Sequence, residues 1–344
     1  MRSQETYQWN TGISGDKITV LLASYQGESY LSEQLDSILN QTIPVSRVIV
    51  SDDGSTDGTR QILEDYCRRY PGRILLNHHV KEGQFAPRPQ FVPPAAMNFF
   101  WLLSGEAASD CSLKADYVML SDQDDVWKPE KTEVLLKRMK ELEASLGKNH
   151  PILVHSDMEV VDRQLKQISP SLSAYQHGDL ERKSFSQILV ENPVTGGAVM
   201  MNRALAELVS QVPDCCLMHD WWIALAASCF GTISFVPEAL YLYRQHGDNA
   251  LGAREIGSAG ELKERMGRQQ QVEETYRKMF AQAKAFGKRY KESMTPETKR
   301  VLQAYLALPL QTPVGRFRNI GRNHFYKSSK LQTLAQCVTI PRHV

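Results

Sequence analysis

The fold is decided by residues 18–53, which read ITVLLASYQGESYLSEQLDSILNQTIPVSRVIVSDD. Ile18 to Ala23 is almost entirely apolar, which is typical of a strand covered on both faces of a parallel sheet. Leucine and isoleucine then recur at helical spacing before Pro44, and a second apolar run spans Arg47 to Ser51. Strand, helix and strand in this order predict a βαβ unit, so we expect an α/β fold with a mainly parallel sheet.

The same alternation continues toward the C-terminus. We predict further strands at Ile74 to Leu76, Tyr117 to Ser121, Ile152 to His155 and Leu240 to Tyr243, and helices near Ile62 to Tyr70 and from Lys131 to Leu146. Between Val80 and Ala96, four prolines disfavour a helix or an interior strand. The sequence therefore predicts a long loop there, which is either a lid over a ligand or a solvated insertion.

The composition is that of an ordinary globular protein. Of the 344 residues, 23% are charged and 42% are hydrophobic, which excludes a disordered or collagen-like chain. The net charge of +1 does not favour a nucleic-acid partner. Six cysteines without a CxxC pair, and a polar lead-in at residues 1–16, favour a reduced, cytoplasmic protein. The charge-free run at 221–237 is too short and too polar for a spanning helix.

The composition changes after Gly252. Residues 259–290 are rich in Glu, Lys, Arg and Gln, which predicts a long exposed helix, and Thr295-Pro296 predicts the start of another. From Gln311 onward there are six Lys or Arg, no Asp or Glu, and interleaved aromatic and aliphatic residues. Such a segment is either a solvated basic tail or a peripheral membrane contact. We therefore divide the chain into a lead-in at 1–16, an α/β domain at 17–252 and a helical, basic C-terminal region at 253–344.

Acidic side chains follow two of the predicted strands. Asp52 and Asp53 come directly after the second strand, and Asp122, Asp124 and Asp125 follow the strand that ends at position 121. In an open α/β sheet, ligands bind outside the carboxyl ends of the strands, so both groups should face one crevice. Carboxylates gathered in this way repel each other, and a hard divalent cation with oxygen ligands would offset their charge.

Other readings of these acidic segments stay open. Residues 52–58 (DDGSTDG) are also typical of a turn that caps a helix. Counted from Asp53, the spacing to Glu64 overlaps that of an EF-hand calcium loop. An EF-hand loop is entered from a helix, whereas this segment follows a strand-like run, so we disfavour that reading. In residues 121–125 (SDQDD), a turn and cap alone would not require three carboxylates.

Two further motifs combine charged groups with aromatic rings or a strand end. In residues 219–222 (HDWW), the tryptophans could stack on a sugar while Asp220 acts as a general base, or the segment could be a helix cap beside core aromatics. Arg244 and His246 follow a predicted strand. The guanidinium could pair with a phosphate, and the imidazole could bind a metal or a phosphate.

An opening pattern and four later motifs resemble the family 2 inverting glycosyltransferases. In chain order they are ITVLLASY (18–25) with LNQT (39–42) and VSDDGSTD (50–57), then SDQDDVW (121–127), TGG (195–197), HDWW (219–222) and YRQHG (243–247). The combination and its order are most similar to the bacterial rhamnosyltransferases that build O-antigen and other cell-surface polysaccharides. The resemblance extends over residues 17–252.

This resemblance implies a GT-A fold, with a nucleotide-sugar donor (dTDP-rhamnose or a UDP-hexose), a saccharide or lipid-linked acceptor, and Mg2+ or Mn2+. Matched by position, it implies a catalytic base at Asp220 and acceptor contacts from Trp221 and Trp222. It further implies donor contacts from Ala23, Tyr25, Asp53, Asp124, Gly196, Gly197 and Arg244, with Asp124 near the ribose or the metal, and metal ligands at Asp122, Asp125 and His246.

Two other classes are compatible with the residues alone. A sugar nucleotidyltransferase usually has a glycine-rich, basic loop after its first strand, whereas Ser24 to Glu28 reads SYQGE, which disfavours that class. A non-catalytic metal-binding or carbohydrate-binding module would use the same acidic loops and tryptophans without turnover. Consumption of a nucleotide sugar would distinguish a glycosyltransferase from such a module.

Overall fold

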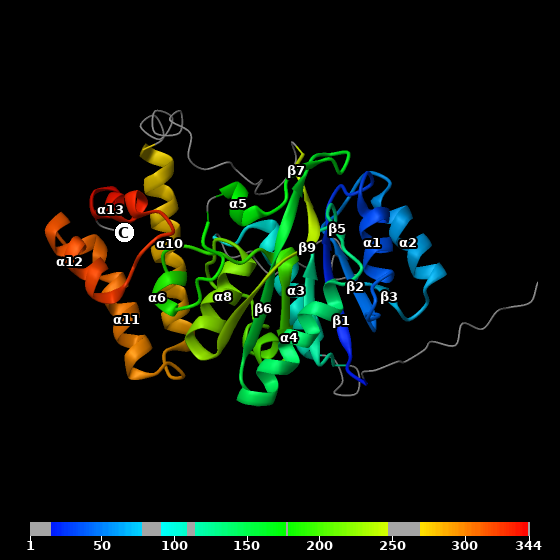
Figure 1. Cartoon of the computed structure of the whole chain (residues 1–344), viewed down its shortest axis with the longest axis horizontal. Coiled ribbons are helices and arrows are strands. Elements are labelled where there is room, and N and C mark those ends of the chain that lie inside the picture. Colours follow the sequence, from blue (N-terminus) through cyan, green and yellow to red (C-terminus); the bar gives the residue numbers. More distant parts are fainter. Residues whose placement is uncertain (1–14, 78–90, 109–113, 177, 247–268, 343–344) are drawn as a thin grey trace, which may run out of the picture.

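The computed structural model describes residues 15–77, 91–108, 114–176, 178–246 and 269–342. Within this part of the chain, nine strands form one curved sheet with helices packed around it (Figure 1). The strands are β1 (Ile18–Ser24), β2 (Arg47–Asp52), β3 (Ile74–Leu76), β4 (Tyr117–Ser121), β5 (Val126–Trp127), β6 (Ile152–Val161), β7 (Gln167–Ser169), β8 (Val199–Asn202) and β9 (Thr232–Arg244). Their order across the sheet is β3-β2-β1-β4-β8-β6-β9-β5, and β7 pairs with β6.

The N-terminal half of the sheet is the predicted parallel unit. β1 pairs in parallel with β2 and β4, and β2 pairs in parallel with β3. The crossover helix α1 (Leu31–Leu39) buries Leu35 and Ile38 against one face. β8 is antiparallel to both β4 and β6, so the complete sheet is mixed. The α/β class is confirmed, and the parallel arrangement holds for β1 to β4 and for the β6–β9 pair.

Helices cover both faces of the sheet. Their bounds are α2 (Thr59–Arg69), α3 (Pro94–Ala108), α4 (Lys131–Leu146), α5 (Leu172–Gln176), α6 (Phe185–Ile188), α7 (Arg203–Leu208) and α8 (His219–Phe230), with a short 3-10 turn η1 (Gly196–Ala198) before β8. α4 agrees with its predicted bounds. α3 begins at Pro94, inside the predicted loop, because proline is compatible with the first turn of a helix. Residues 78–90 of that loop lie outside the described residues.

The C-terminal helices form one end of the molecule (Figure 1). They are α10 (Gln269–Tyr290), α11 (Pro296–Leu306), η2 (Leu308–Leu310), α12 (Pro313–Asn323) and α13 (Lys330–Thr339). The side chain of Thr295 caps α11 by accepting a hydrogen bond from Thr298 N, as the Thr-Pro pair predicts.

Residues 269–290 form the helix that the sequence predicts, α10, but the prediction that this helix is exposed is wrong. In α10, Tyr276, Phe280 and Phe286 are buried in the same core as helix α8. Charged residues and glutamines are frequent in this helix, but its large apolar residues share one face at helical spacing, and that face packs inward. The C-terminal helices are therefore joined to the α/β domain through a continuous hydrophobic core.

None of the helices in the described segments has both the length and the hydrophobicity required to span a bilayer.

Candidate active site

The carboxyl ends of β1, β2 and β4 meet at one edge of the sheet. Ser24, the last residue of β1, pairs with Asp52 at the end of β2, and β4 ends beside them at Ser121. Asp53 and Asp122 follow directly and leave the sheet at the same edge. The two acidic segments therefore lie on the side of the sheet where α/β proteins bind ligands.

Gln123 joins the loop after β1 to the acidic loop after β4. Its Oε1 accepts hydrogen bonds from Ser24 Oγ and Tyr25 N, both at 2.9 Å, and its Nε2 donates to Tyr25 O at 2.7 Å. A Cβ on Gly27 would lie 2.2 Å from Gln123 Oε1, so this close approach requires glycine. The Tyr25 ring is 58% exposed and Ala23 is partly buried. This combination offers an open aromatic face to a flat ligand.

The two aspartates after β2 have different surroundings. Asp52 is buried and accepts a hydrogen bond from Ser55 N at 3.0 Å and an ion-pair contact from Arg60 Nε at 3.4 Å. The turn interpretation is therefore correct for Asp52. Asp53 is only partly buried, and its N–H donates to Ser24 O at 2.8 Å. Because the loop is entered from strand β2, the EF-hand alternative is wrong.

The aspartates after β4, together with Asp220, form a group of interacting charges. Burial, followed by the negative charges of Asp124 and Asp220, raises the pKa of Asp122 to about 7. Asp125 is 1% exposed, and burial, then its aspartate neighbours, raise its pKa well above its ordinary value. Charges from two distant segments of the chain therefore act on each other. This group, Asp122, Asp124 and Asp125, is called the acid cluster below.

A buried lysine lies next to the acid cluster. Lys131, the first residue of α4, is fully buried, and its Nζ donates a hydrogen bond to Gly197 O. The same Nζ is 3.6 Å from the ring centroid of Trp127 and 4.4 Å from that of Tyr241. Burial lowers the pKa of Lys131, whereas the negative charge of Asp125 raises it. The lysine and the acid cluster thus stabilise each other's charged forms.

Two glycines lie between the acid cluster and Asp220. Gly196 N donates to Asp220 Oδ2 at 3.2 Å. A Cβ on Gly197 would lie 3.2 Å from Asp125 Oδ2, and one on Gly196 would lie 2.5 Å from His219 Nε2. Side chains at these positions would push the surrounding groups apart. The Gly196–Gly197 turn therefore allows carboxylates from two separate segments to approach the same backbone.

Asp220 is held in the first turn of α8. Its Oδ1 accepts a hydrogen bond from Asn192 Nδ2 at 3.1 Å, and its Oδ2 accepts the one from Gly196 N. Burial raises the pKa of Asp220 to about 7, although these hydrogen bonds favour the ionised form. A fixed carboxyl group with a pKa near neutrality is well suited to act as a general base.

The two tryptophans after Asp220 occupy different environments. Trp221 is partly buried, and its Nε1 donates to Ile188 O at 2.7 Å. Trp222 is fully buried, with its ring centroid 5.4 Å from that of Phe286. The predicted acceptor contact from Trp222 is therefore corrected: the side chain belongs to the core between α8 and α10, because α8 is apolar on nearly every face.

Arg244 and His246 reach the acid cluster from the end of β9. Arg244 N donates to Asp125 Oδ1 at 3.2 Å, and Arg244 Nε donates to Asp124 O at 2.8 Å. The Arg244 side chain is 3% exposed and forms an ion pair with Glu33. His246 Nε2 lies 2.8 Å from Asp124 Oδ2. Arg244 therefore braces the acid cluster from within the protein, whereas the sequence predicted a contact with the donor phosphate.

The acid cluster and His246 match a divalent cation in the kind of ligand they offer. Carboxylate oxygens suit Mg2+ or Mn2+, and the buried charges would be offset by a cation. Asp124 contacts His246 directly, whereas Asp125 is buried and already accepts a hydrogen bond. Across the described residues, no three His, Cys, Asp or Glu side chains already converge as a metal site. Asp124 is therefore better placed than Asp125 to bind a cation together with His246.

Sequence reasoning assigned no role to Gln123, Lys131 or Asn192. Gln123 stood inside the quoted SDQDD motif, but its hydrogen bonds to the first loop depend on the strand register. Lys131 had no sequence signal, because lysine at the start of a helix is usually exposed. Asn192 precedes a proline in an irregular segment, where a local turn is the ordinary expectation.

Comparisons with known proteins agree with this geometry. Residues 19–93 match the family described as Glycosyl transferase family 2. The chain is 25% identical over 236 residues to the dTDP-rhamnosyl transferase RfbG of Shigella flexneri, covering 67% of this chain and 74% of that protein. It is 24% identical over 259 residues to an uncharacterised glycosyltransferase of a Nostoc species, covering 73% of this chain and 72% of that protein.

A solved structure shares the fold. The crystal structure of S. aureus TarS 1–349 in complex with UDP-GlcNAc superposes with a TM-score of 0.53 and 16% sequence identity, covering 89% of this chain and 80% of that one. The predicted GT-A fold is confirmed by this likeness. The sequence similarities support a glycosyltransferase; they do not identify its donor sugar, and they leave metal dependence open.

Proposed function

We propose that this chain is an inverting glycosyltransferase that transfers a sugar from a nucleotide-sugar donor to a hydroxyl group of a saccharide or lipid-linked acceptor, in the synthesis of a surface polysaccharide. The observation that carries the proposal is the Gly196–Gly197 turn, which Asp220 approaches from one side and Asp125 from the other. This arrangement supports the proposal, because a single displacement requires a proton acceptor close to the leaving diphosphate.

In the proposed reaction, the ionised carboxylate of Asp220 accepts the proton of the acceptor hydroxyl. That oxygen attacks the anomeric carbon of the donor while the bond from this carbon to the diphosphate oxygen breaks, so the configuration is inverted. Asn192 and Gly196 donate to the two carboxylate oxygens and keep them oriented. General-base assistance of this kind contributes roughly 10²- to 10⁴-fold.

The donor nucleotide is proposed to lie over the loop after β1. The exposed ring of Tyr25, beside Ala23, would cover the base, and Asp53 would accept a hydrogen bond from it. Gln123 holds this loop against the acid cluster, so base and diphosphate would be bound by connected segments. Trp221 remains the proposed acceptor contact.

The proposed cation ligands are Asp122, Asp124 and His246, beside the buried Asp125. A bound Mg2+ or Mn2+ would act as a Lewis acid toward the departing diphosphate. Arg244 keeps the acid cluster in place, because its Nε donates to the carbonyl oxygen of Asp124 and its backbone N–H donates to the carboxylate of Asp125.

The proposed donor is dTDP-rhamnose, because RfbG, a similar protein, is named as a dTDP-rhamnosyl transferase. A UDP-hexose is the alternative, since TarS, which shares the fold, was solved with UDP-GlcNAc. The test is a thermal-shift panel of nucleotide sugars with and without Mn2+, followed by an assay for released nucleoside diphosphate. A true donor binds the native state and raises the unfolding temperature by mass action.

Three results of this panel are informative. A larger shift with dTDP-rhamnose than with UDP-GlcNAc, together with release of dTDP, would support the proposed donor, and the reverse order would favour the UDP-hexose alternative. If a nucleotide sugar is instead consumed only when pyrophosphate is added, with formation of a nucleoside triphosphate and a sugar 1-phosphate, the protein is a nucleotidyltransferase. If no nucleotide sugar binds or is consumed, the non-catalytic module becomes the better explanation.

A further inference from the structure

Helices α12 and α13 carry exposed apolar side chains with basic side chains beside them. We propose that this surface binds an anionic lipid bilayer. We call it the apolar–basic surface; it consists of Val314, Phe317, Arg318 and Arg322 on α12 and Lys330, Leu331, Leu334 and Val338 on α13. The proposal concerns where the protein acts and goes beyond its proposed activity.

The apolar side chains of this surface are exposed at regular helical spacing. Phe317 is 59% exposed on α12, and Leu331, Leu334 and Val338 on α13 are 65%, 56% and 71% exposed. In both helices the opposite face is buried; Ile320, for example, lies in the core. Each helix therefore has two apolar sides. One packs against the core, and the other is exposed and is left without a protein partner in the described structure.

These exposed side chains are concentrated in one part of the chain. Of the twelve large hydrophobic side chains that are exposed among the described residues, seven lie between Leu310 and Val338. The other five are spread singly over distant elements. Single exposed apolar residues are ordinary on a protein surface, whereas a concentration of this size marks an interaction site.

A groove extends the apolar surface inward. It lies between α10, α12 and α13, has a volume of about 980 Å³, and is lined in part by Tyr276, Met279, Leu331 and Val338. Two residues of the apolar–basic surface thus form part of its wall. The apolar contact area continues below the surface, as suits an element that rests in the boundary between lipid headgroups and acyl chains.

The positive charge of residues 311–344 favours a negatively charged partner. Residues 311–344 contain six Lys or Arg and no Asp or Glu. Arg318, Arg322 and Lys330 are exposed beside the apolar residues. A second copy of the same surface would bring like charges together, whereas an anionic bilayer attracts each cation with roughly 1 kcal/mol. Charge and apolarity together therefore favour a lipid surface over self-association.

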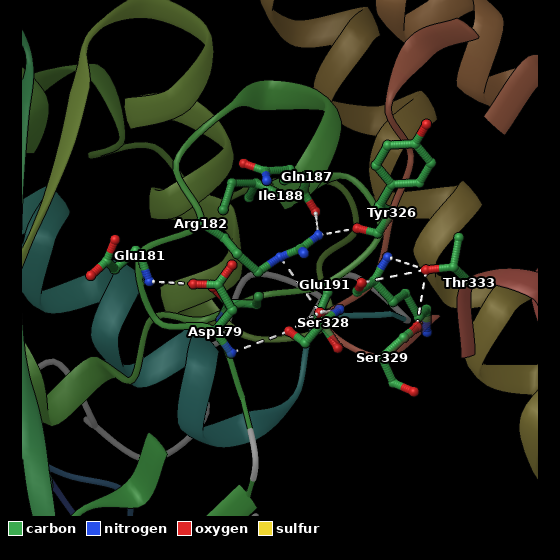
Figure 2. A network of polar contacts seen from close by, with 12 residues as sticks. Asp179, Glu181, Arg182, Gln187, Ile188, Glu191, Tyr326, Ser328, Ser329 and Thr333 are labelled. Carbon is green, nitrogen blue, oxygen red and sulfur yellow. Dashed lines mark hydrogen bonds and ion pairs between the residues drawn. The ribbon is translucent and has the colours of Figure 1, made fainter. Parts of the chain in front are cut away.

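A network of polar contacts holds the segment between α12 and α13 against the α/β domain (Figure 2). Glu191 Oε2 accepts hydrogen bonds from Ser328 N and Ser328 Oγ, both at 2.6 Å. Arg182, which is 3% exposed, donates to Tyr326 O and lies 3.5 Å from Glu191 Oε2. The segment between α12 and α13 is thus anchored by the buried Arg182 and the partly buried Glu191.

The residue that follows Glu191 in the chain contacts the candidate base, Asp220. Asn192, the residue after Glu191, donates to Asp220 Oδ1 at 3.1 Å. The apolar–basic surface therefore has a defined orientation relative to Asp220. A bilayer bound to it would have a defined orientation relative to the active site, which suits an acceptor carried by a membrane lipid.

The test is co-flotation of the full chain with vesicles. One set contains phosphatidylcholine alone, and the other contains phosphatidylcholine mixed with the anionic lipid phosphatidylglycerol. We expect binding to the anionic vesicles that is roughly tenfold or more stronger than to the neutral ones and that weakens with added salt. Equal binding to both sets, or no binding to either, would overturn the proposal. The assay uses no turnover, so its outcome is independent of the proposed function.

Two variants with matched controls locate the contact. The apolar variant is L331Q/L334Q/V338Q, and its control, L75Q/L146Q/I168Q, changes exposed apolar residues elsewhere on the protein. The charge variant is R318Q/R322Q/K330Q, and its control, K137Q/K148Q/K166Q, removes three exposed lysines elsewhere. We expect each surface variant to lose roughly tenfold or more in vesicle affinity and each control to bind like the parent. All changed residues are exposed, so the unfolding temperature should stay near that of the parent.

Two results would contradict the assignment to this surface. The first is unchanged vesicle affinity in both surface variants. The second is self-association of the parent chain in sedimentation experiments that the apolar variant abolishes, without vesicle binding by the parent. The latter would show that this surface joins two copies of the chain.

Discussion

At the scale of the single residue, Asp220 shows how burial and hydrogen bonding act against each other. Burial raises its pKa to about 7, while donors from Asn192 and Gly196 stabilise the carboxylate. The result is a group that is ionised in a useful fraction at neutral pH and is still basic enough to accept a proton. The sequence predicted this aspartate as the base, but its pKa depends on the segments that enclose it.

We predict that Asp220→Asn abolishes most of the turnover and leaves the donor bound. Asparagine keeps the size of the side chain but cannot accept the acceptor proton, so kcat should fall by roughly 10²- to 10⁴-fold. Donor affinity measured by calorimetry should change little. The control is Asp65→Asn on the exposed face of α2, which should retain the parent rate. A similar kcat in the Asp220→Asn variant would remove its assignment as base.

The raised pKa of Asp220 also predicts the pH dependence of the reaction. The base must be ionised in order to accept a proton, and its pKa is about 7. The rate kcat/KM should therefore rise about tenfold per pH unit below this value and level off above it. A pH profile of the parent enzyme measures this. A profile that levels off near pH 4, the ordinary value for an aspartate, would show that burial does not control the base.

At the scale of the element, the loop after β4 and the start of α4 act as one unit. Asp125 faces inward toward Arg244 N, Asp124 faces His246, and Lys131 donates to the Gly197 carbonyl. Adjacent aspartates thus differ in role because the loop turns one side chain toward the core and the other toward the ligand side. Arg244 is the last residue of β9 and His246 lies two residues beyond it, and both come near the acid cluster because β5 pairs with β9 directly after that cluster.

This division predicts different effects for the two neighbouring aspartates. Asp124→Asn should weaken Mn2+-dependent donor binding by roughly tenfold or more, because it removes the carboxylate beside His246. Asp125→Asn should change donor binding less, because its side chain is buried and bonded to Arg244 N. Calorimetry with and without Mn2+ measures both. The opposite ranking would return the metal contact to Asp125, as the sequence predicted.

Lys131 is predicted to stabilise this unit. Lys131→Met keeps the apolar part of the side chain but leaves the acid cluster without its buried ammonium partner. The free energy of unfolding should fall by about 3 to 5 kcal/mol, measured by urea denaturation. Lys137→Met, on the exposed side of the same helix, should change it by no more than about 0.5 kcal/mol. Similar losses in both variants would indicate that only helix stability is affected.

At the scale of the whole molecule, the C-terminal helices complete the core of the α/β domain. The buried face of α10 packs Phe286 and Tyr290 against Trp222 of α8. The same α8 carries Asp220 in its first turn. The helix that positions the candidate base is therefore supported by residues from the C-terminal region, and the two regions are expected to unfold together.

The test of this coupling uses two phenylalanines of the C-terminal region. Phe286 is fully buried, so Phe286→Ala should lower the free energy of unfolding by about 3 to 5 kcal/mol. Phe317 is 59% exposed, and Phe317→Ala should change it by no more than about 0.5 kcal/mol. Denaturation followed by both fluorescence and circular dichroism should give one transition. Two separate transitions would show that the C-terminal helices fold independently.

Patterns that are local along the chain were predictable. The apolar runs identified β1 and β2, helical spacing identified α4 with its bounds, and the Thr295-Pro296 pair identified the start of α11. The acidic residues after β2 and β4 were predictable as a shared edge, because strand ends in a parallel sheet meet. The position of Asp220 within the HDWW motif predicts it as the base.

The orientation of side chains was decided only by tertiary packing. Trp221 and Trp222 are neighbours with the same chemistry, yet only Trp222 is fully buried, because α10 covers that side of α8. Arg244 forms an ion pair with Glu33, a residue more than two hundred positions away. No local sequence pattern could have predicted that this guanidinium already has a carboxylate partner within the protein. The burial, the contacts and the pKa of a side chain depend on segments that are distant in sequence and adjacent in space. The sequence therefore determined the helices, the strands and the positions of the motifs. The tertiary structure decided what each motif residue contacts.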